Sequence, residues 1–496
     1  MYLSLKAKSV SAVPWFLFLL PVFFVFHGCN ENFGFIPFID AAKLSLFYVI
    51  SALISLFILK FIIRKKGLAA LFVFLCMAYF LFFGSMQDWL KNQFGSTVLI
   101  AKYTFIVPAF GVFLITVVIL LAKFPATINA ISKYLNLLFS VLLIIECFLF
   151  IKISIAEREI KKLPVAMTTC NDCPNPDIYF LLFDEYAGRK TLPEKLNFSN
   201  SEFELQLKEK GFHIFNHSNS NYNYTPFSMA SILNMEYLEI GNTISGHNGS
   251  AVGYCLNKIK HSTVKKIFEQ SGYEFVNLSI FEFDGKPAPR PDEVLPVSTR
   301  LITGQTFWKR ASRDLWFNLI TRFKSKKAMK NRTYFNLKNN KNIIGLLKET
   351  VLKNSTKPRF VYSHIRMPHF PYYFNSSGVA QPYEKLNETF FSDTTMYVEY
   401  LKYTNKEIIN LLDYIKKNTV KPSIIILMSD HGFRYFNFAI DDKYIFQNMN
   451  AVFYPDQNYS RLPDSVSAVN QFRIILNSQF KQNLPILKDS TILLSE

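Results

Sequence analysis

Two side chains suited to binding a metal ion stand at the end of an apolar run. Residues 424–428 are apolar, and Asp430, His431 and Gly432 follow one residue later. The run predicts a strand buried on both faces, as in a parallel sheet. Carboxylate and imidazole groups suit zinc or manganese, and open α/β sheets bind ligands at the carboxyl ends of their strands. We expect Gly432 to allow a sharp turn there, although a surface turn alone also explains this sequence.

A second predicted strand also runs into acidic side chains. Residues 177–183 are mostly apolar, and Asp184 and Glu185 follow them directly. A solvated loop would explain one such case, but two strand ends with carboxylates in one domain favour a shared site. The sequence does not decide whether Asp184 or Glu185 binds a metal ion.

A third predicted strand, residues 359–363, leads into a loop that contains basic side chains. His364, Arg366 and His369 stand in this loop with two prolines. Imidazole and guanidinium groups donate hydrogen bonds to the oxygens of a phosphate or sulfate group. Structural histidines bonded to the backbone are the alternative. We take the three side chains as candidate substrate-binding residues.

A threonine begins a predicted helix. Thr225 precedes Pro226, and this pair is typical of a helix N-cap and its first turn. The positive end of a helix is also where phosphate groups are held. An ordinary cap and a nucleophilic hydroxyl are therefore the two interpretations of Thr225.

The hydrophobic residues of the chain are concentrated before residue 155. Half of the 496 residues are hydrophobic. A membrane span needs about 20 apolar residues, and five segments approach or exceed that length. They are residues 10–26, 42–63, 68–83, 98–121 and 135–153. The sequence predicts a bundle of about five transmembrane helices over residues 1–155.

Basic side chains cluster at the segment ends that would face the cytoplasm. Lys6 and Lys8 precede the first segment, and residues 60–66 hold four basic side chains at the end of the second. By the positive-inside rule, the N-terminus is cytoplasmic and everything after residue 155 lies outside. A lipoprotein signal ending before Cys29 is the alternative, but four more apolar segments follow it.

Two polar features of the chain each have two interpretations. Glu146 lies within the fifth apolar segment, where it either pairs structurally or lines a polar pathway. Residues 306–322 mix aromatic side chains with arginines. They form either a helix on the soluble domain with a solvated basic face, which we favour, or a helix on the membrane surface.

Helix and strand patterns alternate after a linker at residues 156–176. Helices are predicted at residues 199–210, 262–270 and 393–417, between the predicted strands. The alternation predicts an α/β domain over residues 177–496, with a mostly parallel central sheet flanked by helices.

Charge and cysteine content limit the function classes. The formal net charge is +18, but no helix-turn-helix or zinc-finger pattern is present, so we expect no nucleic acid partner. Cys170 and Cys173 in the linker predict a local disulfide, because the domain that follows is extracytoplasmic.

Four of these features occur in an order that resembles a known family. They are Asp184 after a strand, Thr225 in a Thr-x-x-Ser helix start, His369 in a His-x-Pro-Tyr loop, and Ser-Asp-His-Gly at residues 429–432. The chain resembles the sulfatase-like branch of the alkaline phosphatase superfamily. Within that branch it is similar to membrane enzymes such as lipoteichoic acid synthase and the phosphoethanolamine transferases, which carry five membrane helices before an extracytoplasmic catalytic domain.

The resemblance implies a metal-dependent active site. A divalent ion, zinc or manganese, would be bound, and a second ion is left open. The ligands would be Asp184, Thr225, Asp430 and His431, with Glu185 as the alternative first ligand. Thr225 would be the nucleophile, and His364, Arg366 and His369 would bind substrate.

The resemblance also implies a reaction and a location. The protein would be a multi-pass enzyme of the bacterial inner membrane with a periplasmic catalytic domain. It would move a phosphoethanolamine or phosphoglycerol head group from a membrane phospholipid to an envelope glycan or lipid, through a phospho-threonine intermediate. A tethered phospho- or sulfo-ester hydrolase and a non-catalytic envelope scaffold are the alternatives. The sulfatase precursor motif Cys/Ser-x-Pro-x-Arg is not found at Thr225, which disfavours ordinary sulfate-ester hydrolysis.

Overall fold

The chain divides into two compact units. The computed structural model describes residues 13–33, 36, 38–94, 99–160, 175–239, 249–289, 299–312, 330–331 and 333–494. The first unit combines Met1–Lys162 with Glu293–Ser325, and the second combines Leu163–Asp292 with Lys326–Glu496. The predicted disulfide between Cys170 and Cys173 lies outside the described residues.

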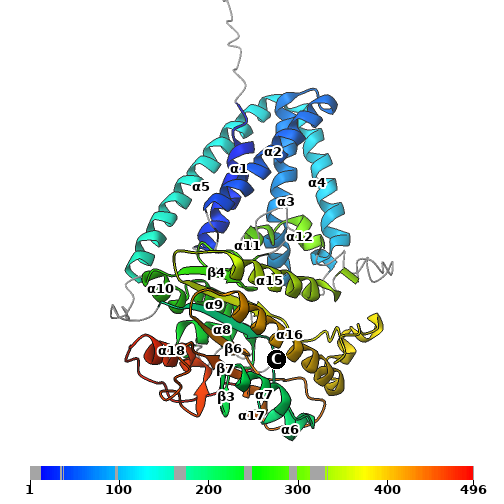
Figure 1. Cartoon of the computed structure of the whole chain (residues 1–496). Helices are drawn as coiled ribbons and strands as arrows, with labels where there is room; N and C mark the ends of the chain where they lie inside the picture. Colours follow the sequence, from blue (N-terminus) through cyan, green and yellow to red (C-terminus); the bar gives the residue numbers. More distant parts are fainter. Residues whose placement is uncertain are drawn as a thin grey trace, which may run out of the picture. The chain divides into compact units, whose positions relative to one another are not determined.

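The first unit, which we call the membrane unit, is built from apolar helices, drawn in blue to cyan in Figure 1. They are α1 (Phe16–Glu31), α2 (Phe38–Ile62), α3 (Lys66–Phe94), α4 (Tyr103–Lys123) and α5 (Pro125–Ile160), with a 3-10 turn, η1 (Leu99–Ala101), before α4. Among the described residues, α2 to α5 are long and apolar enough to cross a membrane. The shorter α1 packs against α2, α3 and α5. The prediction of an N-terminal bundle of apolar helices is confirmed.

A segment from the middle of the chain also belongs to the membrane unit. Two short helices, α11 (Arg300–Thr303) and α12 (Phe307–Ala311), pack against α1 and α3. The expected domain of residues 177–496 is therefore interrupted by a return segment, Glu293–Ser325, that clusters with the membrane helices.

Specific contacts hold the described part of the return segment. Phe307 packs edge-on against Phe83, with ring centres 4.9 Å apart. Arg310 donates two hydrogen bonds to Asp88, at 2.7 and 2.5 Å. The favoured interpretation of residues 306–322, a helix on the soluble domain, is thus wrong for its described part, because Phe307 and Arg310 contact membrane helix α3.

The second unit, which we call the catalytic unit, is built on a six-stranded sheet. The strands are β1 (Asp177–Phe183), β2 (His213–Ile214), β4 (Glu274–Leu278), β5 (Arg359–Ile365), β6 (Ser423–Met428) and β7 (Asn450–Phe453). Their order is β2-β7-β6-β1-β5-β4. β4, β5, β1 and β6 are parallel, whereas β7 is antiparallel to both of its neighbours. The predicted mostly parallel sheet is confirmed.

Helices cover both faces of this sheet. Alternate residues of β1 point to opposite sides, so Phe180 joins one hydrophobic cluster and Leu181 joins the other. The first face is covered by α8 (Thr225–Asn234), α9 (Gly249–Lys260), α10 (Thr263–Gln270) and α18 (Gln471–Gln479). The second is covered by α7 (Ser201–Glu209), α15 (Phe335–Leu352) and α16 (Thr394–Asn418). Both faces of the central strands are buried, which explains why their sequences are almost continuously apolar.

Short elements complete the catalytic unit. They are α6 (Thr191–Leu196), α17 (Lys443–Phe446), the 3-10 turns η4 (Tyr383–Lys385), η5 (Glu388–Phe390) and η6 (Ala468–Asn470), and a parallel pair of strands, β3 (His217–Asn219) and β8 (Ser465–Ser467).

Candidate active site

The register of three parallel strands brings the predicted site residues to one edge of the sheet. Leu182 in β1 lies opposite both His364 in β5 and Met428 in β6. The residues that follow β1 and β6 therefore meet: the Glu185 N–H donates to Asp430 Oδ1 at 3.1 Å. This edge holds the carboxyl ends of the strands, as predicted for a ligand site.

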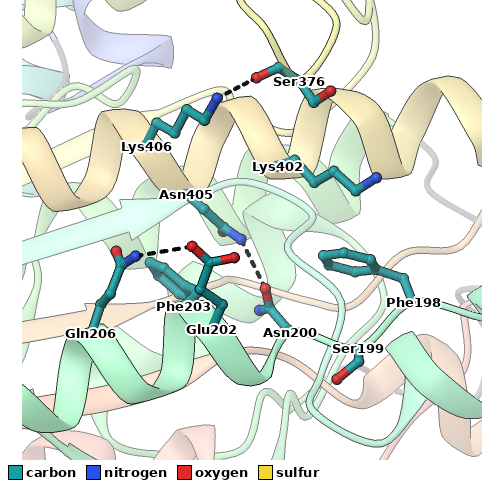
Figure 2. Close-up of a pocket in the computed structure, with 10 residues that line it drawn as sticks. All are labelled: Phe198, Ser199, Asn200, Glu202, Phe203, Gln206, Ser376, Lys402, Asn405 and Lys406. Atoms are coloured by element: carbon teal, nitrogen blue, oxygen red, sulfur yellow. Dashed lines mark hydrogen bonds between the residues drawn. The ribbon is translucent and has the colours of Figure 1, made fainter.

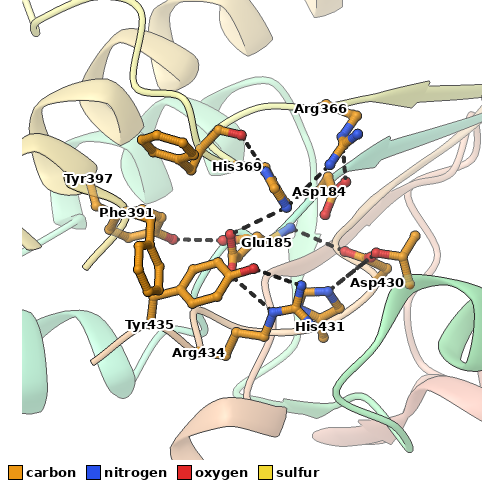
Figure 3. Close-up of polar contacts among 12 residues, drawn as sticks. Asp184, Glu185, Arg366, His369, Phe391, Tyr397, Asp430, His431, Arg434 and Tyr435 are labelled. Carbon is orange, nitrogen blue, oxygen red and sulfur yellow. Dashed lines mark hydrogen bonds and ion pairs between the residues drawn. The ribbon is translucent and has the colours of Figure 1, made fainter. Parts of the chain in front are cut away.

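Asp184, Asp430 and His431 form a buried cluster that fits a divalent cation, and we call these three residues the triad (Figure 3). One potential ligand atom from each lies within 4.8 Å of the others. Among the described residues, Asp184 Oδ1 and Asp430 Oδ2 have no hydrogen-bond partner although they are buried. Buried carboxylate oxygens without partners are costly, and a cation between them would remove that cost.

The imidazole of His431 is oriented as a metal ligand would be. Its Nδ1 lies 2.8 Å from the Gly432 carbonyl, which can only accept, so Nδ1 carries the proton. Nε2 then presents its lone pair, 3.3 Å from Asp430 Oδ2. Burial lowers the pKa of His431, which favours the neutral form that metal ions bind.

The hydroxyl of Thr225 stands beside this cluster. Helix α8 begins at Thr225, with Tyr224 as its N-cap. The helix thus starts one residue earlier than predicted, because the N–H groups of Phe227 and Ser228 already bond the Tyr224 carbonyl. Thr225 is not the cap, and its Oγ1 lies 3.4 Å from His431 Nε2. The hydroxyl is available to a reaction at the positive end of the helix.

Glu185 points away from the triad and into a different set of partners. Its carboxylate is buried, 3.5 Å from Arg434 Nε and 3.9 Å from His369 Nε2. Burial raises its pKa to about 8, although Arg434 opposes the shift. Its backbone φ is 64°, a left-handed conformation that is rare for a residue with a side chain. Geometry therefore groups Asp184, rather than Glu185, with Asp430 and His431.

His364 lies within β5, not in the loop after it, and is fully buried. Its Nε2 is 3.5 Å from Asp184 Oδ2, and its Nδ1 faces the Tyr362 hydroxyl at 3.0 Å. Burial would raise the pKa of Asp184, but His369, His364 and Arg366 hold it well below its usual value.

His369 and Arg366 lie on the open side of Asp184. The Nδ1 of His369 donates to the Phe370 carbonyl at 2.6 Å, so Nε2 offers a lone pair. Burial lowers the pKa of His369 to about 4, which makes this imidazole neutral near pH 7. The permanent positive charge beside Asp184 is therefore Arg366, whose Nε lies 3.5 Å from Asp184 Oδ2. With the proton on Nδ1, His369 can accept a hydrogen bond at Nε2. Whether His369 binds substrate stays a prediction.

Arg434 and Tyr435 belong to the site but were not predicted from the sequence. Arg434 packs over the Tyr224 ring at 4.3 Å and donates to the Tyr435 hydroxyl at 3.1 Å. Tyr435 contacts Phe391 edge-on, with ring centres 4.8 Å apart. In the sequence, they are marked only by their positions, three and four residues after His431. No motif spacing points to these two positions.

Gly432 is required for a different reason from the one expected. A Cβ atom at this position would lie 2.2 Å from the Gln447 carbonyl oxygen and 2.8 Å from that of Ile445. The glycine permits a close approach between two backbone segments, rather than a left-handed turn.

A separate cavity of about 250 Å³ lies between α7 and α16 (Figure 2). Asn200 and Asn405, which line it, both bond the hydroxyl of Tyr186, at 2.8 and 2.5 Å. The cavity includes none of the predicted site residues. The amides of Asn200 and Asn405 bond each other and Tyr186, and the amide of Gln206 faces Glu202 at 3.5 Å.

The edge of the sheet thus combines a cluster that could hold a metal ion with a hydroxyl at the start of a helix, an arrangement that can place a nucleophile beside a cation. A family model described as Sulfatase matches residues 297–464. The match contains His364, Arg366, His369, Asp430 and His431, while Asp184 and Thr225 precede it. The match spans about a third of the chain and agrees with the predicted resemblance to sulfatase-like enzymes.

Solved structures with similar folds include three bacterial proteins. The C-terminal periplasmic domain of EptC from Escherichia coli has 12% identity and a TM-score of 0.39, covering 64% of this chain and 86% of that one. The integral membrane lipooligosaccharide phosphoethanolamine transferase A from Neisseria meningitidis has 12% identity and a TM-score of 0.39, with 94% and 95% covered. A putative sulfatase from Bacteroides fragilis has 14% identity and a TM-score of 0.39, with 63% and 75% covered. A comparison with curated proteins finds no match.

Proposed function

We propose that this protein transfers a phospho-head group, of the phosphoethanolamine or phosphoglycerol type, from a membrane phospholipid to a cell-envelope glycan or lipid. The observation that carries the proposal is the Thr225 hydroxyl, 3.4 Å from Nε2 of a triad histidine at the start of α8. The apolar helices of the same chain support a lipid donor. The proposed location is the bacterial inner membrane, with the catalytic unit in the periplasm.

The triad would hold a divalent ion, zinc or manganese, through Asp184, Asp430 and His431. Such an ion, when bound, makes a neighbouring hydroxyl easier to deprotonate and neutralises anionic oxygens. Arg366 and Arg434 add two permanent positive charges to the site. Burial raises the pKa of Glu185 to about 8, so this carboxyl is mostly neutral near pH 7. With a divalent ion, the two arginines would outweigh Asp184 and Asp430, and the site would attract an anionic phosphodiester.

Thr225 would act as the nucleophile. Its hydroxyl would lose its proton and form a bond to phosphorus while the bond from phosphorus to the diacylglycerol oxygen breaks. The departing oxygen would take up a proton, so the step releases none overall. Arg366 would bind a non-bridging oxygen through donors that are not fully used, since its Nε has no hydrogen-bond partner among the described residues.

An acceptor hydroxyl would then take the group from Thr225. The lone pair on His369 Nε2 can accept a hydrogen bond from that hydroxyl and orient it. If water takes this place, the same site acts as a hydrolase, which is the alternative outcome of the reaction.

The test is the intact mass of the detergent-solubilised full chain after incubation with mixed phospholipids and either zinc or manganese. The wild type should gain a phospho-head-group adduct, localised to Thr225 by peptide mapping, and Thr225→Ala should gain none. Ser231→Ala is the matched control, because this hydroxyl lies in the same helix but donates to the Glu236 carbonyl.

The outcomes separate the three candidate functions. An adduct on wild type and Ser231→Ala alone supports the transferase, and its mass identifies the group. Phosphate or head-group release without an acceptor supports the hydrolase. A protein that binds no metal and forms no adduct would be a scaffold, and the proposal would be wrong.

A further inference from the structure

We infer that Arg434 is a positioning residue that holds Thr225 in place beside the triad. We call its contacts with Asn223, Tyr224, Tyr435 and Glu185 the Arg434 brace. The effect of the brace on turnover rests on the proposed function, whereas its effect on the start of α8 does not.

One side of the guanidinium fixes the turn that leads into α8. Arg434 Nη1 donates to the Asn223 carbonyl at 3.0 Å. The guanidinium carbon lies 4.3 Å from the centre of the Tyr224 ring. Asn223 and Tyr224 are the two residues immediately before Thr225, so a hydrogen bond and a stacking contact act directly on the backbone that positions the hydroxyl.

The other side connects this turn to the two loops that supply the triad. Arg434 Nε lies 3.5 Å from Glu185 Oε1. The N–H of Glu185 donates in turn to Asp430 Oδ1 at 3.1 Å. Arg434 itself follows β6 by only six residues, and its Nη2 donates to Tyr435 at 3.1 Å. A single guanidinium thus joins the loop after β1, the loop after β6 and the turn before α8. Figure 3 shows its contacts with Glu185 and Tyr435.

Arg366, the other arginine of the site, is held much less firmly. Its side chain is 30% exposed, against 14% for Arg434. Its side-chain contacts with Asp184, Asn336 and His369 are long, at 3.5, 3.5 and 3.4 Å. In the part of the chain that the structure describes, its side chain donates to no backbone carbonyl. The difference assigns substrate binding to Arg366 and positioning to Arg434.

The expected consequence of losing the brace is a misplaced nucleophile rather than an altered metal site. Among the described residues, Arg434 forms no hydrogen bond or ion pair with the side chain of Asp184 or His431, and only its charge acts on them. A variant that keeps this charge therefore separates positioning from electrostatics. Displacing a reacting group by about 1 Å lowers turnover by about 100-fold. Metal affinity should stay close to that of the wild type.

The test variant is Arg434→Lys in the full chain, with Arg473→Lys as the matched control. Lysine keeps the positive charge near Glu185 but lacks the planar fork that bonds Asn223 and stacks on Tyr224. Arg473 makes the same kind of contact at the other end of α8, where its Nε and Nη2 donate to the Met235 carbonyl at 3.0 and 2.7 Å.

Hydrogen exchange measures the brace without any substrate. The reporters are the amides of Phe227 and Ser228, which bond the Tyr224 carbonyl at 3.1 and 2.9 Å. Arg434→Lys should accelerate their exchange by about 10-fold or more, and Arg473→Lys should leave it unchanged. Diacylglycerol release from phosphatidylethanolamine micelles should fall by about 100-fold in kcat for Arg434→Lys, with KM and the Kd for manganese within about threefold.

Each result decides one point. Unchanged exchange at Phe227 and Ser228 in Arg434→Lys, or equal acceleration in Arg473→Lys, would overturn the inference. A loss of manganese affinity in step with kcat would also overturn it, because Arg434 would then support the metal site. Accelerated exchange in a protein whose wild type releases no diacylglycerol would support the brace and count against the proposed function.

Discussion

Two buried carboxylate clusters, one in each unit, differ in whether their oxygens are satisfied. In the membrane unit, Glu146 Oε1 lies 2.7 Å from His27 Nδ1, and Oε2 accepts from Asn30 Nδ2 at 2.6 Å. In the triad, by contrast, Asp184 Oδ1 and Asp430 Oδ2 have no partner among the described residues. A buried carboxylate whose oxygens are hydrogen-bonded by neighbouring side chains needs no ligand to stabilise it. A buried carboxylate oxygen without a partner indicates a site for a ligand.

The comparison also answers the question that the sequence left open for Glu146. Its two oxygens are paired with side chains of α1, and Asn30 donates a further bond to the Glu146 carbonyl at 2.9 Å. These contacts join α1 to α5. We therefore interpret Glu146 as a structural pair rather than part of a polar pathway.

The largest expected difference between the clusters is in activity. Asp430→Asn should lower turnover by about 1,000-fold or more and abolish stoichiometric metal binding, because it removes a charged ligand. Glu146→Gln should leave turnover per folded molecule within about twofold. Elemental mass spectrometry measures the metal content of both variants, and diacylglycerol release measures their turnover. Equal losses in the two variants would contradict the distinction.

The next difference is a loss of stability in the membrane unit. Glu146→Leu should lower the free energy of unfolding by about 2 kcal/mol, because it leaves Asn30 and His27 without their acceptor. Thermal unfolding in detergent measures the effect. Ile144→Leu, at a residue that is 68% exposed on the same helix, is the control and should change little.

Stability should change in the opposite direction at the triad. In the presence of a chelator, Asp430→Asn should raise the free energy of unfolding by about 1 kcal/mol, because Asp430 Oδ2 is buried and has no hydrogen-bond partner among the described residues. With saturating metal the order should reverse, since only the wild type gains binding energy. A metal-free Asp430→Asn less stable than the wild type would show that the carboxylate is satisfied by the protein.

The smallest expected effect on stability is at Glu31, which contacts His27 from the exposed side. Glu31 lies 3.4 Å from His27 Nε2, but its side chain is 65% exposed. Glu31→Gln should change the free energy of unfolding by less than about 0.5 kcal/mol. The same unfolding assay, with Glu146→Leu measured in parallel, tests whether burial rather than pairing sets the size of the effect.

The strands and the positions of Asp184 and Asp430 at their ends could be predicted, because apolar runs specify where these strands lie. Residues 177–183 and 424–428 are buried on both faces. The end of each apolar run therefore marks the end of a strand, and Asp184 and Asp430 stand just beyond these ends. Helix α16 was predicted almost to the residue because Asp393 caps it, accepting from the Met396 N–H at 2.9 Å. These features depend on local sequence alone.

Features that depend on contacts between distant segments could not be predicted. The choice between Asp184 and Glu185 follows from backbone conformation and from Arg434, which lies 249 residues after Glu185 in the sequence. The protonated nitrogen of His369 is set by a carbonyl at the neighbouring residue, which a sequence pattern does not reveal. The return segment was missed because its partners, such as Asp88, stand more than 200 residues earlier in the chain.

The return segment has a consequence for how the protein can be cut into pieces. Because Glu293–Ser325 belongs to the membrane unit, the chain passes between the two units three times: once through the linker, once before the segment and once after it. A secreted fragment starting at residue 177 would carry Ile302 and Phe307 without the helices that cover them, and would be prone to aggregate. A soluble enzyme should instead be obtained by replacing the segment with a flexible glycine-serine linker, whose length is varied until the catalytic unit folds.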